Sequence, residues 1–119
     1  MSLETLTQKS HTVSRGFTYN YYTHNARAGK PTVLLIHGWP DTAEVWAELI
    51  VNHLIPAGNG ILAIDDLGSG GSSKPSQLED YDFEKQADDI KEILDQQGLD
   101  KVVVLGHDWV SYTLFSSFR

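Results

Sequence analysis

Cysteine is absent from this sequence of 119 residues. Disulfide bonds and thiolate metal sites are therefore excluded, and the composition fits a reducing compartment. Basic residues are scarce as well, with 9 Lys and Arg against 16 Asp and Glu and a formal net charge of −7. A nucleic-acid partner needs clustered basic side chains, so none is expected. No apolar run approaches the length of a bilayer span, so no membrane partner is expected either.

The chain also lacks internal repeats, low-complexity tracts and long linkers. Its length allows one domain at most, over residues 1–119. The polar segment 1–11 has neither the basic start nor the apolar core of a secretory signal, so we expect a cytoplasmic location.

Short apolar runs alternate with amphipathic segments along the rest of the chain. Segments 32–36, 61–64 and 102–105 are typical of strands buried on both faces of a parallel sheet. Segment 11–22 is rich in β-branched and aromatic residues around Gly16, which predicts a hairpin or two short strands. Strands alternating with helices predict the α/β class, with three α/β/α layers and a mostly parallel sheet.

Two helices are predicted between these strands. The first follows Asp41, which forms a capping-box pattern with Glu44, and its expected apolar face comprises Val45, Trp46, Leu49, Ile50 and Leu54. The second follows the expected cap Asp82 and ends before Gly98, with an apolar stripe at Phe83, Ala87, Ile90 and Leu94.

Ligands of open parallel sheets bind at the carboxyl ends of the strands, so the residues after each strand are the candidate site. One such segment, 106–109, reads Gly106-His107-Asp108-Trp109 between a strand and a helix, the layout of a nucleophile elbow. Asp108 then occupies the place of the nucleophile. An alternative is that Asp108 only caps the helix, and the two roles are compatible because a helix N-terminus also stabilises a carboxylate.

The Gly- and Ser-rich segment 68–73 invites a nucleotide-binding interpretation. It lacks the Gly-Lys-Ser/Thr of a Walker loop, and Ser73 stands where a dinucleotide fingerprint has its third glycine. We therefore expect a connection that needs unusual backbone angles rather than a phosphate site.

The motif His37-Gly38-Trp39-Pro40, the 65–75 loop and segment 106–109 together resemble the epoxide-hydrolase branch of the α/β-hydrolase family. The resemblance implies the N-terminal part of that fold, with five strands, the start of the nucleophile helix and no cap domain. It assigns the oxyanion hole to the amides of Trp39 and Trp109. His37 and His107 are then structural hydrogen-bonding residues.

An aspartate nucleophile favours an electrophilic sp3 carbon, because attack on an ester would give a mixed anhydride. The expected partner is thus a small-molecule epoxide, and neither a metal nor an organic cofactor is implied. Haloalkane dehalogenation is the rival reaction, but many dehalogenases that resemble this chain have Asn at the position of Trp39. A catalytically inactive binding module is the alternative from another class.

The family's chain order places the acid and the base histidine after the nucleophile. All five histidines of this chain precede Asp108, and the tyrosines of the family's cap domain are unplaced. We therefore expect a truncated chain that forms the alkyl ester without turning over. The open edge of segment 102–105 is an expected site of self-association.

Overall fold

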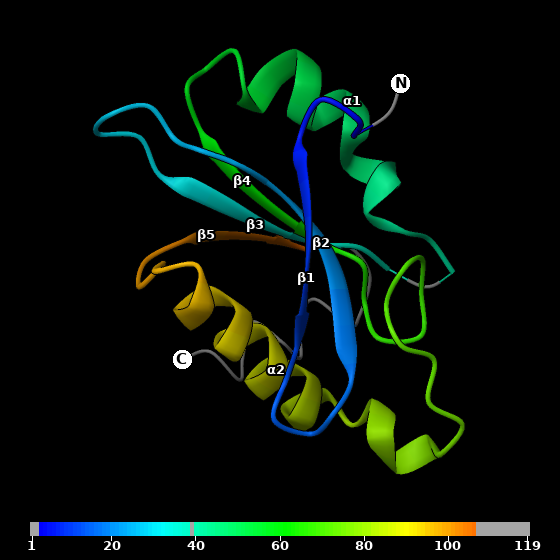
Figure 1. Ribbon diagram of the computed structural model, residues 1–119. Helices are drawn as coiled ribbons and strands as arrows, with labels where there is room; N and C mark the ends of the chain where they lie inside the picture. Colours follow the sequence, from blue (N-terminus) through cyan, green and yellow to red (C-terminus); the bar gives the residue numbers. More distant parts are fainter. Residues whose placement is uncertain (1–2, 39, 107–119) are drawn as a thin grey trace.

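The computed structural model describes residues 3–38 and 40–106 and consists of a twisted sheet with helices on both faces (Figure 1). The strands are β1 (Thr7–Thr12), β2 (Thr18–His24), β3 (Thr32–Ile36), β4 (Gly60–Ile64) and β5 (Val103–Gly106). The helical segments are η1 (Ala43–Trp46), α1 (Ala47–Leu49), η2 (Ile50–Leu54), η3 (Leu78–Tyr81) and α2 (Phe83–Gln96).

The sheet has the strand order β1-β2-β4-β3-β5. β1 and β2 form an antiparallel hairpin, which was predicted from segment 11–22 but begins earlier, at Thr7; β2 also pairs antiparallel with β4. β3 lies between β4 and β5 and is parallel to both. The described sheet is therefore mixed, and its parallel part consists of the three strands that carry the candidate site residues at their ends.

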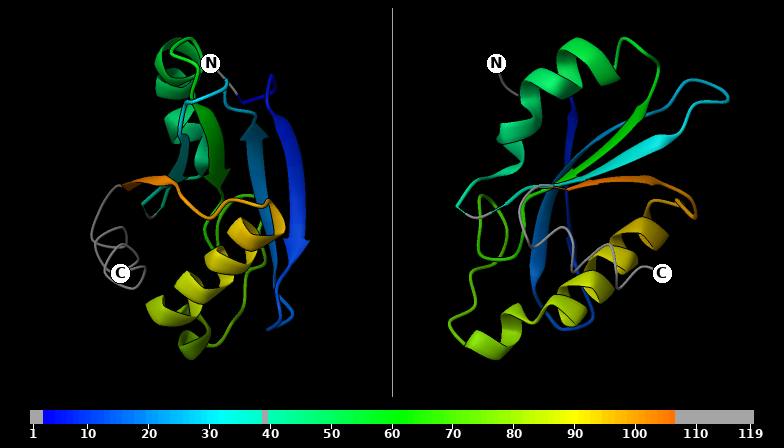
Figure 2. Two further views of the ribbon diagram at one scale, coloured as in Figure 1. Left: turned by 90° about the vertical axis from the view of Figure 1, so that its left-hand side faces the viewer. Right: turned by 180° about the vertical axis from the view of Figure 1, so that it is seen from behind.

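Side chains from β3 and β4 alternate between two cores, one on each face of the sheet. Leu34, Ile36, Leu62 and Ile64 face α2, where they pack with Ala87, Ile90 and Ile93. Val33, Leu35, Ile61 and Ala63 face the opposite way and pack with Ala43, Ala47 and Ile50. This period of two follows from strand geometry. The two helical layers lie on opposite faces of the sheet (Figure 2), which confirms the expected three-layer arrangement.

The first helical stretch differs from the predicted single helix. Its N-cap is Thr42, whose side-chain oxygen accepts from the Glu44 N–H, so the expected cap at Asp41 was wrong by one residue. The stretch begins as a 3-10 turn and ends as a π turn, closed by the Ile55 N–H bonding to Ile50 O. A 3-10 turn has about three residues per turn instead of about 3.6, so it rotates the apolar stripe. Val45, predicted to face the core, is consequently 51% exposed.

Helix α2 matches its prediction closely. The Asp82 side chain accepts from the Lys85 N–H at the N-terminus, and Gly98 takes a left-handed φ of 70° just beyond the C-terminus. Ala87 and Ile90 are buried, as the spacing predicted. Within residues 3–38 and 40–106, no helix combines the length and apolarity needed to cross a bilayer.

Strand β5 is less enclosed than its sequence predicted. Segment 102–105 was expected to be buried on both faces, but Val103 is 51% exposed and Val104 and Leu105 are only partly buried. Gly106, expected to form the turn, is instead the last residue of the strand. In the described part of the chain β5 is an edge strand, paired with β3 alone.

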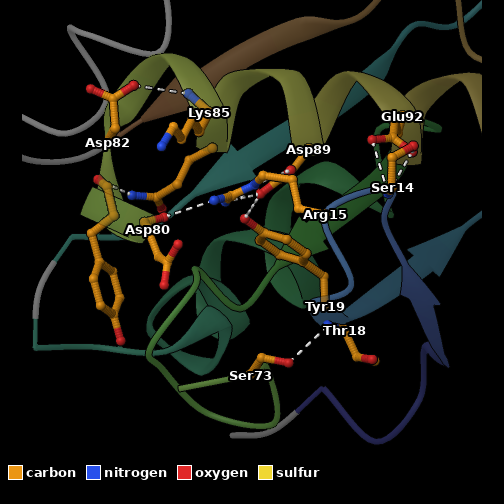
Figure 3. Close-up of polar contacts among 12 residues, drawn as sticks. Ser14, Arg15, Thr18, Tyr19, Ser73, Asp80, Asp82, Lys85, Asp89 and Glu92 are labelled. Atoms are coloured by element: carbon orange, nitrogen blue, oxygen red, sulfur yellow. Dashed lines mark hydrogen bonds and ion pairs between the residues drawn. The ribbon is translucent and has the colours of Figure 1, made fainter. Parts of the chain in front are cut away.

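A buried polar cluster joins the β1–β2 hairpin to α2 (Figure 3). Asp89 of α2 is only 1% exposed, and its carboxylate accepts from Arg15 Nε at 3.0 Å, Arg15 Nη2 at 2.5 Å and the Tyr19 hydroxyl at 2.6 Å. The Asp89 hydrogen bond and charge raise the pKa of Arg15, while burial raises the pKa of Tyr19. Arg15 and Tyr19 therefore stay protonated, and their hydrogen bonds to both oxygens of Asp89 compensate the burial of its charge.

Candidate active site

Three strands end side by side at one edge of the sheet. The register pairs Ile36 of β3 with Ile64 of β4 on one side and with Gly106 of β5 on the other. The chain therefore leaves β3 at His37 and β4 at Asp65 next to the end of β5, as expected for parallel strands. The predicted site residues Trp39, His107, Asp108 and Trp109 lie outside the described residues.

His37 is fully buried and uses both ring nitrogens on backbone groups. Its Nε2 accepts from the Asp66 N–H at 2.9 Å, and its Nδ1 lies 2.7 Å from the Gly38 carbonyl oxygen. Burial lowers the pKa of His37, with the nearby carboxylates of Asp65 and Asp41 opposing that effect. In this geometry neither nitrogen is available to take a proton from a ligand.

The chain turns sharply after His37. The Asp41 N–H donates to the Gly38 carbonyl oxygen at 3.0 Å, and Pro40 is exposed within this turn. We call His37, Gly38, Pro40 and Asp41 the His37 turn. The Gly38 carbonyl oxygen contacts both His37 Nδ1 and the Asp41 N–H, and these two contacts hold the turn in its conformation.

Asp65 fixes three other segments around the end of β4. Its Oδ1 accepts from the Ala43 N–H at 2.8 Å, at the start of η1. Its Oδ2 accepts from the Asn20 side-chain amide of β2 at 2.8 Å and from the Gly71 N–H at 3.0 Å. Asp65 is buried, and these bonds compensate its removal from water. The function of Asp65 visible here is to join the loops.

The loop after Asp66 is tied to β2 rather than free to hold an anion. Ser72 Oγ donates to the Asp65 carbonyl oxygen at 2.6 Å and accepts from the Asn20 N–H at 2.9 Å. Ser73 Oγ accepts from the Thr18 N–H at 2.8 Å. The loop contains glycines with left-handed φ, as expected from its composition. Its Gly71 amide is already directed at the Asp65 carboxylate, which further disfavours phosphate binding.

Gly70 is required at its position. Its φ is +49°, and a Cβ added there would collide with the Asp65 carboxylate. The close approach of the loop backbone to this carboxylate therefore depends on the absence of a side chain.

Asp66 has the least satisfied polar group near the strand ends. Its side chain is 12% exposed, and Oδ1 is buried without a hydrogen-bond partner among the described residues. Oδ2 lies 3.7 Å from His37 Nδ1. Burial raises the pKa of Asp66 well above its usual range, and the charge of Asp65 adds to the rise. Burial therefore favours the protonated form of Asp66.

The described residues contain no group of three or more His, Asp or Glu side chains arranged to hold a metal ion. The strand ends carry three hydrogen-bonded groups: the His37 ring, the Asp65 carboxylate, whose oxygens accept amide hydrogens, and the Gly38 carbonyl group. Such an arrangement can hold backbone amides and a neighbouring nucleophile in place without itself reacting.

The sequence profile of the alpha/beta hydrolase fold family matches residues 31–115, and the chain belongs to this family. The crystal structure of Epoxide Hydrolase A from Mycobacterium thermoresistibile superposes with a TM-score of 0.77 at 32% identity, over 93% of this chain and 34% of that one.

Epoxide hydrolases also stand among its relatives by sequence, which confirms the predicted resemblance. Epoxide hydrolase A of Mycobacterium tuberculosis is 38% identical over 89 residues, or 75% of this chain and 27% of that protein. Epoxide hydrolase 4 of Mus musculus is 35% identical over 94 residues, or 79% of this chain and 25% of that protein. The chain therefore spans about a quarter of the length of these relatives.

The sequence directed attention to the strand ends but did not reveal what the two aspartates after β4 do. Asp65 and Asp66 are adjacent and chemically identical, yet Asp65 accepts hydrogen bonds on both oxygens, whereas Asp66 has a buried oxygen with no partner in the part of the chain that the structure describes. The partners of Asp65 come from β2, η1 and the glycine loop, so no local pattern could identify them. The one available signal was a pair of acidic residues directly after a buried strand.

Proposed function

We propose that this chain carries the nucleophile of an epoxide-hydrolase-type reaction, in which Asp108 attacks an epoxide carbon. The observation that carries the proposal is the alignment of Ile36, Ile64 and Gly106 at one edge of the sheet. This register places the end of β3 next to the end of β5, and Asp108 follows Gly106 by two residues in the sequence. The match to the hydrolase family through residue 115 and the epoxide hydrolases among the relatives support the assignment.

The chemistry suits a carboxylate. One oxygen of Asp108 forms a bond to a ring carbon of the epoxide, the carbon–oxygen bond of the strained ring breaks, and the ring oxygen takes a proton from water. The product is a hydroxyalkyl ester of Asp108. Hydrolysis of that ester by water would release a diol and restore the carboxylate, and the proton set free would neutralise the hydroxide left when water protonated the ring oxygen.

The amides of Trp39 and Trp109 are proposed as the oxyanion hole for the hydrolysis step. Support comes from the His37 turn, which directly adjoins Trp39 and is fixed by the contacts of His37 and Asp41 to Gly38 O. An oxyanion hole works because its donors are held in place before the reaction, and these contacts supply that rigidity on one side.

Slow or absent turnover is part of the proposal. A base is needed to activate water for ester hydrolysis, and every histidine of the chain precedes Asp108. Among them, His37 already uses both ring nitrogens. The alkyl ester should therefore accumulate on this chain rather than turn over.

The test is mass spectrometry of the chain after incubation with styrene oxide. We expect an added mass of one epoxide molecule, mapped to Asp108, and its loss in the Asp108→Ala variant. Asp88→Ala, which removes an exposed carboxylate from α2, is the matched control and should keep the adduct. Adducts formed with an alkyl halide but not with the epoxide would favour dehalogenation. A folded chain that forms no adduct with either reagent would favour a binding module.

We also propose a cytoplasmic location and weak self-association through the edge of β5. The absence of cysteine supports the first, and the half-exposed Val103 on an edge strand supports the second. Sedimentation velocity should show a concentration-dependent dimer that the Val103→Lys variant abolishes. Fractionation of cells that produce the chain tests its location.

A further inference from the structure

His37 holds its turn as a neutral ring in a single tautomer. Because Nε2 accepts the Asp66 N–H, this nitrogen carries no proton. Nδ1 then carries the only ring proton and donates it to the Gly38 carbonyl oxygen, 2.7 Å away. The two contacts connect the chain after β3 to the chain after β4.

With a neutral His37, the Asp66 carboxyl has no cationic partner among the described residues. The Nδ1 proton is directed to Gly38, while Asp66 Oδ2 lies 3.7 Å from that nitrogen. Asp66 Oδ1 is buried with no hydrogen-bond partner among residues 3–38 and 40–106. An ionised carboxylate in this place would be removed from water without compensation, whereas a protonated carboxyl is not charged and avoids that cost.

We propose that Asp66 is a positioning residue for the His37 turn and that it works in its protonated, uncharged form. An uncharged Asp66 leaves the Nδ1 proton to Gly38 and allows Nε2 to accept the Asp66 amide, so both ties of the turn persist. The catalytic consequence rests on the proposed function, since Trp39 is attached to this turn. The protonation state rests on the contacts of His37 and Asp66 alone.

Ionisation of Asp66 would disturb the turn at high pH. A negative oxygen near Nδ1 competes with the Gly38 carbonyl oxygen for the ring proton. At low pH the disturbance comes from His37, because a proton on Nε2 would face the Asp66 N–H and break that bond. The other titratable groups that act on the pair among the described residues are Asp65, on both side chains, and Asp41, on the ring. Burial lowers the pKa of His37 and raises that of Asp66, which widens the range in which both are uncharged.

Nuclear magnetic resonance of the whole chain tests the protonation states directly. At pH 7 the ring ¹⁵N shifts of His37 should show the neutral form with the proton on Nδ1. The Asp66 ¹³Cγ shift should be that of a protonated acid and should titrate above the other aspartates. An imidazolium at His37, or an Asp66 that titrates in the ordinary range, would overturn the proposal.

Hydrogen exchange of the amides at positions 41 and 66 tests the effect on the turn. In the wild-type chain and in the Asp88→Asn control, protection should fall about tenfold as Asp66 ionises. Asp66→Asn keeps the size without the charge and should retain protection over the same pH range. An alkaline loss in Asp66→Asn equal to that of the wild-type chain would contradict the proposal, as would no alkaline loss in the wild-type chain.

The slow hydrolysis of the Asp108 ester, the step to which Trp39 is assigned, should follow the same pattern, with an alkaline decline of its rate in the wild-type chain that Asp66→Asn removes. If no variant forms an ester, the proposed function fails, while the resonance and exchange results still decide the role of Asp66. A decline that persists unchanged in Asp66→Asn would refute the catalytic consequence.

Discussion

Replacing Asp89 with asparagine tests how much the polar cluster between the β1–β2 hairpin and α2 stabilises the fold. The carboxylate accepts hydrogen bonds from Arg15 and from the Tyr19 hydroxyl while it is 1% exposed. Removing one partner of a buried ion pair typically costs about 3–5 kcal/mol. The Arg15 side chain is 22% exposed and can regain water, and asparagine keeps one acceptor oxygen. We therefore expect Asp89→Asn to lower the free energy of unfolding by about 2–3 kcal/mol.

Urea unfolding followed by circular dichroism measures this loss, and Asp88→Asn on the exposed face of α2 is the control. The control should change the free energy by less than about 0.5 kcal/mol. A double-mutant cycle with Tyr19→Phe should give a coupling of about 1 kcal/mol or more, because the two groups share a hydrogen bond. An Asp89→Asn variant as stable as the control would refute the assignment of stability to this cluster.

Three further predictions concern the strand ends. Gly70→Ala should lower the free energy of unfolding in urea by about 2–4 kcal/mol, because the new Cβ would meet the Asp65 carboxylate at a residue with a left-handed φ. The control Gly98→Ala also has a left-handed φ but lies in open space, so it should lower this free energy by only about 1 kcal/mol. Because the fold raises the pKa of Asp66, this residue stays protonated in the folded chain at pH values where it ionises in the unfolded chain, so the free energy of unfolding should fall as pH rises. Asp66→Asn should remove that fall and should be more stable than the wild-type chain at pH 7, as thermal melts can measure. Because the fold lowers the pKa of His37, this residue stays neutral in the folded chain at pH values where it takes up a proton in the unfolded chain. The free energy of unfolding should therefore fall as pH drops below about 6.5. A urea midpoint that does not change between pH 7 and pH 5 would contradict this prediction.

Helix α2 could be predicted from the sequence because its determinants are local. Asp82 caps it, Gly98 ends it, and the apolar spacing identifies its buried face. The first helical stretch could not be predicted as well, although Asp41 and Glu44 match a capping pattern. The cap is the neighbouring Thr42, and competition between two adjacent polar side chains is decided by geometry that the sequence does not display.

The location of the candidate site followed from the strand pattern, because parallel strands end at one edge. The open edge of β5 was expected, but the exposure of its faces was not, since an apolar segment does not reveal what covers each face. The Arg15–Tyr19–Asp89 cluster was missed for a similar reason. Asp89 lies beside Ile90 in an otherwise clear amphipathic pattern, and its partners are in a hairpin distant in the chain.

The position of β3 in the sheet has a consequence during synthesis. Both neighbours of β3, β4 and β5, come later in the chain, while β2 is hydrogen-bonded to β4 instead. The apolar residues of β3 thus emerge from the ribosome before any strand that can cover its edges. Until these strands have emerged, β3 is accessible to chaperones and to other nascent chains; the insertion of β4 between β2 and β3 covers one edge, and pairing with β5 covers the other.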